Sequence, residues 1–140
     1  MFNFIKKLRI RKKRKEFIKN VLHLDIEVET SFDEFKAFIE EMKDLCYMIS
    51  INKKDIIEIV KDIPDETRSK INFHLGFVLG KYYKNVTGQT AKATNLVKMK
   101  NISVESKKFI AETMEIVHST TSTVEDMFEG LYELMQIKRG

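Results

Sequence analysis

Apolar residues recur every three or four positions along most of this chain, which is the spacing of one face of an α-helix. The clearest run begins at a capping box, Ser31 with Glu34, whose side chains can satisfy free backbone donors at a helix start. The run continues at spacings of 3, 4, 3, 4 and 3: Phe32, Phe35, Ile39, Met42, Cys46 and Ile49. The pattern predicts a helix that ends near Ser50 and turns one apolar stripe toward a neighbour.

The last third of the chain carries a longer run of the same kind. Its positions alternate at spacings of 4 and 3: Ile110, Met114, Val117, Thr121, Val124, Phe128, Leu131 and Met135. The phase continues through STTST at 119–123, which helix propensity alone would treat as a break. We therefore expect one long helix over residues 104–137, and a second capping box at Ser122 and Glu125 leaves two shorter helices as the alternative.

Two further helices are expected between these runs. A short one follows Asn52, a candidate N-cap, and places four apolar residues on one face: Ile56, Ile59, Val60 and Ile63. The next begins at Pro64, whose missing N–H costs nothing in a first turn, and ends near Gly88, a candidate C-terminal cap. Residues 88–101 are then expected to form a loop with a short helix.

The helix after Pro64 is apolar on several sides. Its main stripe consists of Ile71, Leu75, Val78 and Tyr82. Phe73, Phe77 and Leu79 occupy other faces, which predicts that this is the central helix of the fold. Gly76 and Gly80 are interpreted as points of close helix packing.

These patterns together predict an all-α fold, an antiparallel helical bundle of about five helices with a basic amphipathic N-terminal helix or arm. The 140 residues are enough for one bundle domain, placed at 17–140, with the arm at 1–16. The heptad stripes of the second and last helices are compatible with a homodimer or other homo-oligomer, and an intramolecular bundle explains them equally well.

The opening stretch, MFNFIKKLRIRKKRKEFIKN, has a different pattern. Its first apolar residues lie within an arc of about 100° on a helical wheel: Met1, Phe4, Ile5 and Leu8. A second apolar group lies on an arc rotated by roughly 120° from the first: Phe17, Ile18, Val21 and Leu22. Residues 11–15 between them are all Lys or Arg, and because burying unpaired charge is costly, every face of that turn is expected to stay in solvent. The second group is expected to pack on the bundle, and the first to meet something else.

Charge is strongly segregated along the chain, although the net charge is only +4. Residues 1–20 hold nine Lys or Arg and one acid, whereas residues 25–66 hold thirteen acids and five bases. The single Cys46 excludes an internal disulfide framework and favours a reducing, cytoplasmic setting. No apolar run approaches the ~18–20 residues needed to span a bilayer, and the N-terminus lacks the order of a secretory signal. The expected location is therefore cytoplasmic, with peripheral membrane association as an option.

Three interpretations of the opening stretch remain open. In the first, a basic block binds a polyanion, with nucleic acid of low sequence specificity as the leading ligand: Lys6, Lys7, Arg9, Arg11, Lys12, Lys13, Arg14 and Lys15. In the second, an apolar tip enters an anionic membrane surface while the basic block meets headgroups: Phe2, Phe4, Ile5 and Leu8. In the third, the tip docks on a partner protein or a sister subunit, and the charges meet solvent or the acidic 25–66 region. KYYK at 81–84 is a second basic-aromatic candidate, although Tyr82 belongs to a core stripe.

No catalytic or cofactor chemistry is predicted. Glu115 and His118 have the E-x-x-H spacing of di-iron bundles, but one copy lacks the further ligands that such a site needs. Cys46 lies on a core stripe, which favours a buried, inert thiol. We expect a binding or accessory protein rather than an enzyme, with no metal and no cofactor.

Overall fold

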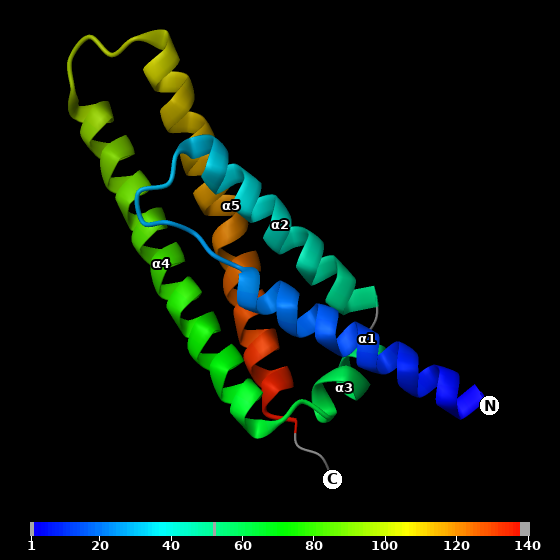
Figure 1. Cartoon of the computed structure of the whole chain (residues 1–140). Coiled ribbons are helices and arrows are strands. Elements are labelled where there is room, and N and C mark those ends of the chain that lie inside the picture. Colours follow the sequence, from blue (N-terminus) through cyan, green and yellow to red (C-terminus); the bar gives the residue numbers. More distant parts are fainter. Residues whose placement is uncertain (1, 52, 138–140) are drawn as a thin grey trace.

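The computed structural model describes residues 2–51 and 53–137, with the side chains of 3–47 and 54–137. It contains α1 (Phe2–His23), α2 (Phe32–Ile51), α3 (Lys53–Lys61), α4 (Asp65–Lys98) and α5 (Val104–Met135) (Figure 1). No strand occurs within the described ranges. The predicted all-α helical bundle is confirmed.

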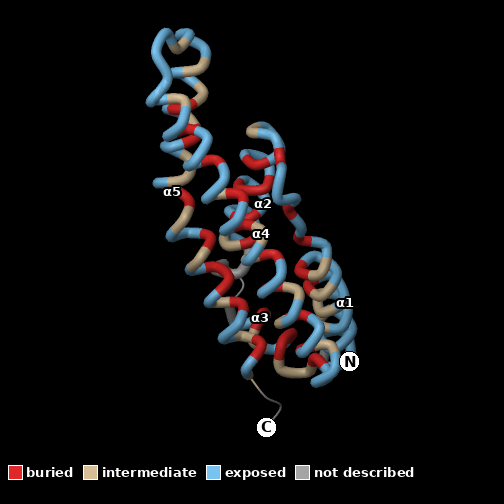
Figure 2. The backbone as a smooth tube through the Cα atoms, turned by 90° about the vertical axis from the view of Figure 1, so that its left-hand side faces the viewer, coloured by how far each residue is buried: buried red, intermediate tan, exposed pale blue. Residues whose placement is uncertain are grey.

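A long antiparallel hairpin of α4 and α5 is the scaffold of the fold (Figure 1). The α2 helix packs on α5, whereas α1 packs on α3 and α4. The outer end of the hairpin projects beyond the other helices and is largely exposed (Figure 2). The core therefore lies in the body of the bundle, where all five helices supply apolar side chains.

Several local signals do what the sequence predicts. Ser31 caps α2, because its hydroxyl accepts a hydrogen bond from the backbone N–H of Glu34 at 3.3 Å. The four apolar residues assigned to the short helix are all buried: Ile56, Ile59, Val60 and Ile63. Asn52, the expected cap of that helix, and the side chain of Ile49 lie outside the described residues.

The end of α4 is a correction. The sequence placed a helix stop near Gly88 and a loop over 88–101, but α4 continues to Lys98. Gln89 and Ala93 are buried along this extension, which pairs with α5, and this packing overrides the weak local propensity of Gly and Thr. The hydroxyls of Thr90 and Thr94 donate to backbone carbonyls four residues earlier at 2.9 Å, so they are satisfied inside the helix.

The position of α4 is a second correction. Its stripe is buried as expected, but Phe73 is 79% exposed and Phe77 is 52% exposed. A Cβ atom added at Gly76 or at Gly80 would meet nothing within 4 Å, so neither glycine is a close-packing point in the chain itself. The α4 helix is therefore buried on one side only and is not the central helix.

The last segment forms the single long helix that was expected, Val104–Met135. The hydroxyls of Thr120 and Thr121 donate to backbone carbonyls one turn earlier, which lets STTST stay helical. The stripe differs from the prediction in its first half, where Thr113 and Thr120 are buried and Met114 is exposed. A straight helix drifts relative to a strict seven-residue repeat, so one heptad pattern cannot describe the whole contact face.

A buried arginine joins three parts of the body. The Nε of Arg68 donates to the Ile63 carbonyl at 2.9 Å, and its two other nitrogens donate to the carbonyls of Val60 and Met135. These carbonyls lie at or near the C-terminal ends of α3 and α5, where backbone acceptors lack helical partners and a cation is favoured. Arg68 thus fixes the start of α4 against the ends of two other helices.

Candidate functional site

The first helix has one face on the bundle and one face in solvent. Of the second apolar group, Phe17 and Val21 are buried, and Ile18 and Leu22 are partly buried against the same core. This part of the prediction is confirmed. Ile10 also packs partly against the core, so contact with the body begins within the segment assigned to the arm.

The central turn of α1 is not solvated on every face, which corrects the sequence expectation. The Lys13 ammonium donates to the Asp55 carboxylate at 2.7 Å. The Arg14 guanidinium donates to the Ile59 carbonyl at 2.9 Å and to the Asp62 carboxylate at 3.2 Å. Because α3 and the residue that follows it supply two carboxylates and a backbone carbonyl at this point, the two bases can approach the body without being left unpaired.

The contact with Lys13 lowers the pKa of one carboxyl group on α3. The hydrogen bond from Lys13, together with its positive charge, holds the pKa of Asp55 below its usual range. Both partners remain substantially exposed, with 36% of the Lys13 side chain and 44% of the Asp55 side chain in contact with solvent. The pair therefore orients α1 on α3 more than it stabilises the fold.

The opposite side of α1 faces solvent. We define the outer face of α1 by six exposed residues that lie within an arc of about 100° at the helical rotation per residue: Phe4, Ile5, Leu8, Lys12, Lys15 and Lys19. The apolar residues occupy its first turns and are 65%, 54% and 47% exposed, in chain order. The three lysines continue the same face toward the middle of the molecule. One surface thus joins an exposed apolar cluster to a row of cations.

The other residues of the basic block have different surroundings. Lys6, Lys7, Arg9 and Arg11 are all exposed, and all but Arg9 line an open cleft of about 520 Å³ that also contains Glu58 of α3 and Asp62, the residue after α3. The side chain of Phe2, the remaining member of the apolar tip, lies outside the described residues. Four bases of the block, with Arg14 as the fourth, thus line a cleft that they share with two acids, and the outer face carries positive charge away from that cleft.

The second basic-aromatic candidate is divided between core and surface. Tyr82 is fully buried and stacks with Phe35, at a centroid distance of 6.3 Å. Burial raises its pKa. Tyr83 is partly exposed, and a hydrogen bond to the Glu125 carboxylate raises its pKa to about 12. Tyr82 is thus unavailable to stack on a base, as its place on the core stripe indicated.

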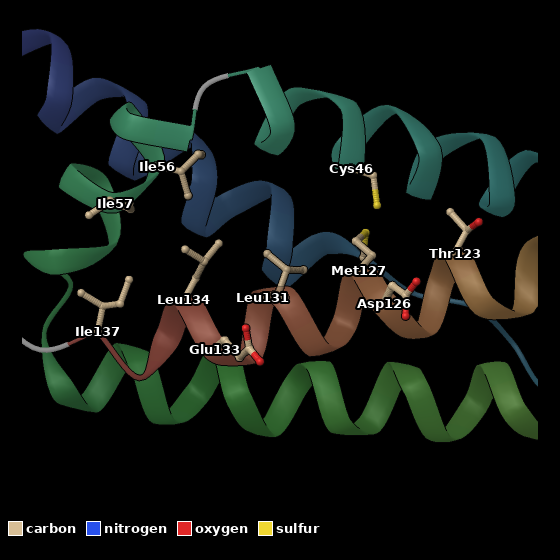
Figure 3. Close-up of a pocket in the computed structure, with 11 residues that line it drawn as sticks. Cys46, Ile56, Ile57, Thr123, Asp126, Met127, Leu131, Glu133, Leu134 and Ile137 are labelled. Carbon is tan, nitrogen blue, oxygen red and sulfur yellow. The ribbon is translucent and has the colours of Figure 1, made fainter.

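An apolar groove that the sequence did not reveal lies between α2, α3 and α5 (Figure 3). It has a volume of about 700 Å³ and these lining residues: Cys46, Ile56, Ile57, Thr123, Asp126, Met127, Gly130, Leu131, Glu133, Leu134 and Ile137. Cys46 on α2 points toward Met127 on α5 across it (Figure 3). Burial, with a smaller contribution from Asp126, raises the pKa of the Cys46 thiol, which keeps it protonated and a poor nucleophile.

The described part of the chain contains no group of three or more His, Cys, Asp or Glu side chains that could hold a metal ion. Glu115 and His118 are both exposed on α5. None of the helices in the described ranges is both long enough and apolar enough to cross a bilayer.

The fold and the outer face of α1 define a small helical bundle that presents a cationic and apolar helix to solvent. Comparisons with models of protein families, with curated proteins and with solved structures find no match to this chain.

Proposed function

We propose that this protein is a non-enzymatic binding protein that attaches peripherally to anionic membrane surfaces through the outer face of α1. The observation that carries the proposal is the exposure of Phe4, Ile5 and Leu8 on the same face as the lysine row. An interfacial helix binds by burying apolar side chains at the boundary of headgroups and acyl chains while its lysines contact anionic headgroups. The outer face supplies both kinds of contact.

The two parts of the outer face contribute comparable amounts. Three partly inserted apolar side chains supply on the order of 3 kcal/mol, since full burial of one such side chain is worth ~1.5–3 kcal/mol. Three lysines near an anionic surface supply about as much, at ~1 kcal/mol each. Removal of either the apolar cluster or the lysine row should therefore weaken membrane binding strongly. Salt should weaken binding only partly, because it screens the lysines and leaves the apolar contact in place.

Nucleic acid is the second candidate ligand. Six residues of the basic block are exposed, and cations on a helix are sufficient to contact phosphates: Lys6, Lys7, Arg9, Arg11, Lys12 and Lys15. Phosphate contacts give no role to an exposed apolar cluster beside the cations. The membrane proposal accounts for the whole outer face, and the nucleic-acid proposal for its charged part.

The experiment compares two sets of variants on two ligands. The full chain, a tip variant (Phe4→Ser, Ile5→Ser, Leu8→Ser) and a lysine variant (Lys12→Gln, Lys15→Gln, Lys19→Gln) are sedimented with vesicles of neutral lipid alone or with about 30% anionic lipid, a content that makes a surface strongly negative. The same proteins are titrated with duplex DNA at low and moderate salt. Tyr132→Ser, at an exposed position on α5, is the matched control.

The membrane proposal predicts binding to anionic but not neutral vesicles, lost in both variants and kept in the control. Binding to DNA that both the full chain and the tip variant share, together with no binding to anionic vesicles, would establish the nucleic-acid alternative instead. Absence of binding to either ligand at low salt would remove both.

A further inference from the structure

The side of α4 that faces away from the core carries an apolar patch of two phenylalanines with two glycines beside them. Phe73 and Phe77 are largely exposed, and Gly76 and Gly80 lie on the same side with open space above them. At the helical rotation per residue, this side is roughly opposite to the stripe of Ile71, Leu75, Val78 and Tyr82. We call it the outer face of α4. It has no part in the proposed membrane contact.

The charges along this face are separated by sign. Asp65 and Glu66 lie in the first turn of α4, and the Glu66 side chain is 87% exposed. Lys81 and Lys84 lie beyond the patch, toward the C-terminal end of the helix. Lys81 already pairs with Asp25 at 2.9 Å and covers the Phe77 ring at 4.5 Å, whereas Lys84 is exposed. Lys70, one turn beyond Glu66, is 68% exposed and pairs with it at 3.9 Å. The first turns therefore carry two acids and one lysine, the middle of the face is apolar, and Lys81 and Lys84 make the end beyond the patch basic.

We infer that a second copy of this chain docks on the outer face of α4, antiparallel, about a two-fold axis near Leu75. Such an axis sets Phe73 against Phe77 of the second copy and Glu66 against Lys84 of the second copy. The symmetry repeats each pair with the two copies exchanged. An isologous contact must be self-complementary in this way.

The glycines explain how two helices approach closely on this face. Gly80 of each copy lies along one edge of this contact, where the second helix can approach bare backbone. Helices with small residues at a crossing pack closer than helices with large ones, which increases the contact area of the flanking phenylalanines. The antiparallel arrangement also places opposite ends of the two helix dipoles together.

The test is sedimentation equilibrium of the full chain and of Gly80→Leu. The added side chain meets nothing within 4 Å of its Cβ in the single chain, so the fold is kept, as circular dichroism and thermal melting would verify. The inference predicts a dimer for the full chain and a weakening of about tenfold or more in the dissociation constant for Gly80→Leu. A monomer at about 100 μM, well above ordinary specific dissociation constants, or a dimer that Gly80→Leu leaves intact, would overturn it.

A charge exchange tests the two-fold register separately. Glu66→Lys and Lys84→Glu each place like charges together twice, so each should weaken the dimer. The double variant restores two opposite pairs and should recover it. Failure of the double variant to recover the dimer would contradict this axis, and Tyr132→Ser, outside the face, should leave the dimer unchanged.

Discussion

The two halves of α1 belong to one continuous helix and both carry apolar and basic residues, yet they meet different surroundings. In the inner half, Phe17 and Val21 are 2% and 0% exposed, and Lys13 and Arg14 are bound to α3. In the outer half, Phe4 and Ile5 are more than half exposed. The presence of apolar side chains is thus not enough to bury a part of a helix. The side chains must also lie on the face that is turned toward the body of the bundle.

The difference comes from the phase of the apolar residues around the helix axis. The inner group faces the body, whereas the outer group is rotated away from it while the helix itself continues without a break. Lys13 and Arg14 lie between the two apolar groups and bind the helix to α3. The apolar group before them faces solvent, and the apolar group after them faces the core. The inner half is part of the core, and the outer half leaves its apolar side chains in solvent.

The largest expected contrast between the halves is in their aromatic residues. Phe17→Ala removes a buried ring and should lower the free energy of unfolding by about 3–4 kcal/mol. Phe4→Ala removes an exposed ring and should change that free energy by no more than about 0.5 kcal/mol. Urea unfolding followed by circular dichroism measures both. Equal losses for the two variants would show that the outer half also belongs to the core.

A smaller contrast is expected between two arginines of the same block. Arg14→Gln leaves the Ile59 carbonyl and the Asp62 carboxylate without the guanidinium and should cost about 1–2 kcal/mol of unfolding free energy. Arg11→Gln, at an exposed position, should cost less than about 0.5 kcal/mol. The same urea titrations decide between them, and a cost for Arg11→Gln as large as for Arg14→Gln would contradict the division at this turn.

The smallest effect is a dependence of stability on pH. The pKa of Asp55 is lowered in the folded chain by Lys13, so the stability it contributes is present above the unfolded carboxyl value of about 3.9 and is lost as pH falls through the folded value. Because the pair is exposed, the loss should be under about 1 kcal/mol. Asp55→Asn should remove this part of the acid dependence. A variant with the full chain's dependence between about pH 5 and pH 2 would show that the pair contributes nothing.

Much of the fold follows from apolar periodicity, as in α2, α3 and the single helix α5. Periodicity failed where burial depends on a distant partner. The extension of α4 beyond Gly88 is held by α5, and a propensity argument contains no information about that contact. Phe73 and Phe77 on further faces of the helix predicted a central helix, whereas their phase around α4 places them in solvent.

The site was partly predictable for the same reason. The phase difference between Phe4 and Phe17 was visible on a helical wheel, and it indicated that the first apolar group turns away from the bundle. The pairing of Lys13 and Arg14 was not visible, because their partners lie more than forty residues away, on α3 and just after it. The apolar groove was also missed, since Cys46, Ile57 and Leu134 come from three helices and share no sequence pattern.

Insertion of α1 into a membrane can be measured by fluorescence, because this chain contains no tryptophan. Phe4→Trp places a single indole in the apolar tip, and Tyr132→Trp places one at an exposed position on α5 as the control. We predict that anionic vesicles shift the emission of the Phe4→Trp variant to shorter wavelength and protect its indole from aqueous quenchers, with no change for the Tyr132→Trp variant. If the emission of Phe4→Trp stays unchanged on vesicles that bind the protein, the outer half of α1 does not enter the membrane, and this result would contradict the membrane proposal.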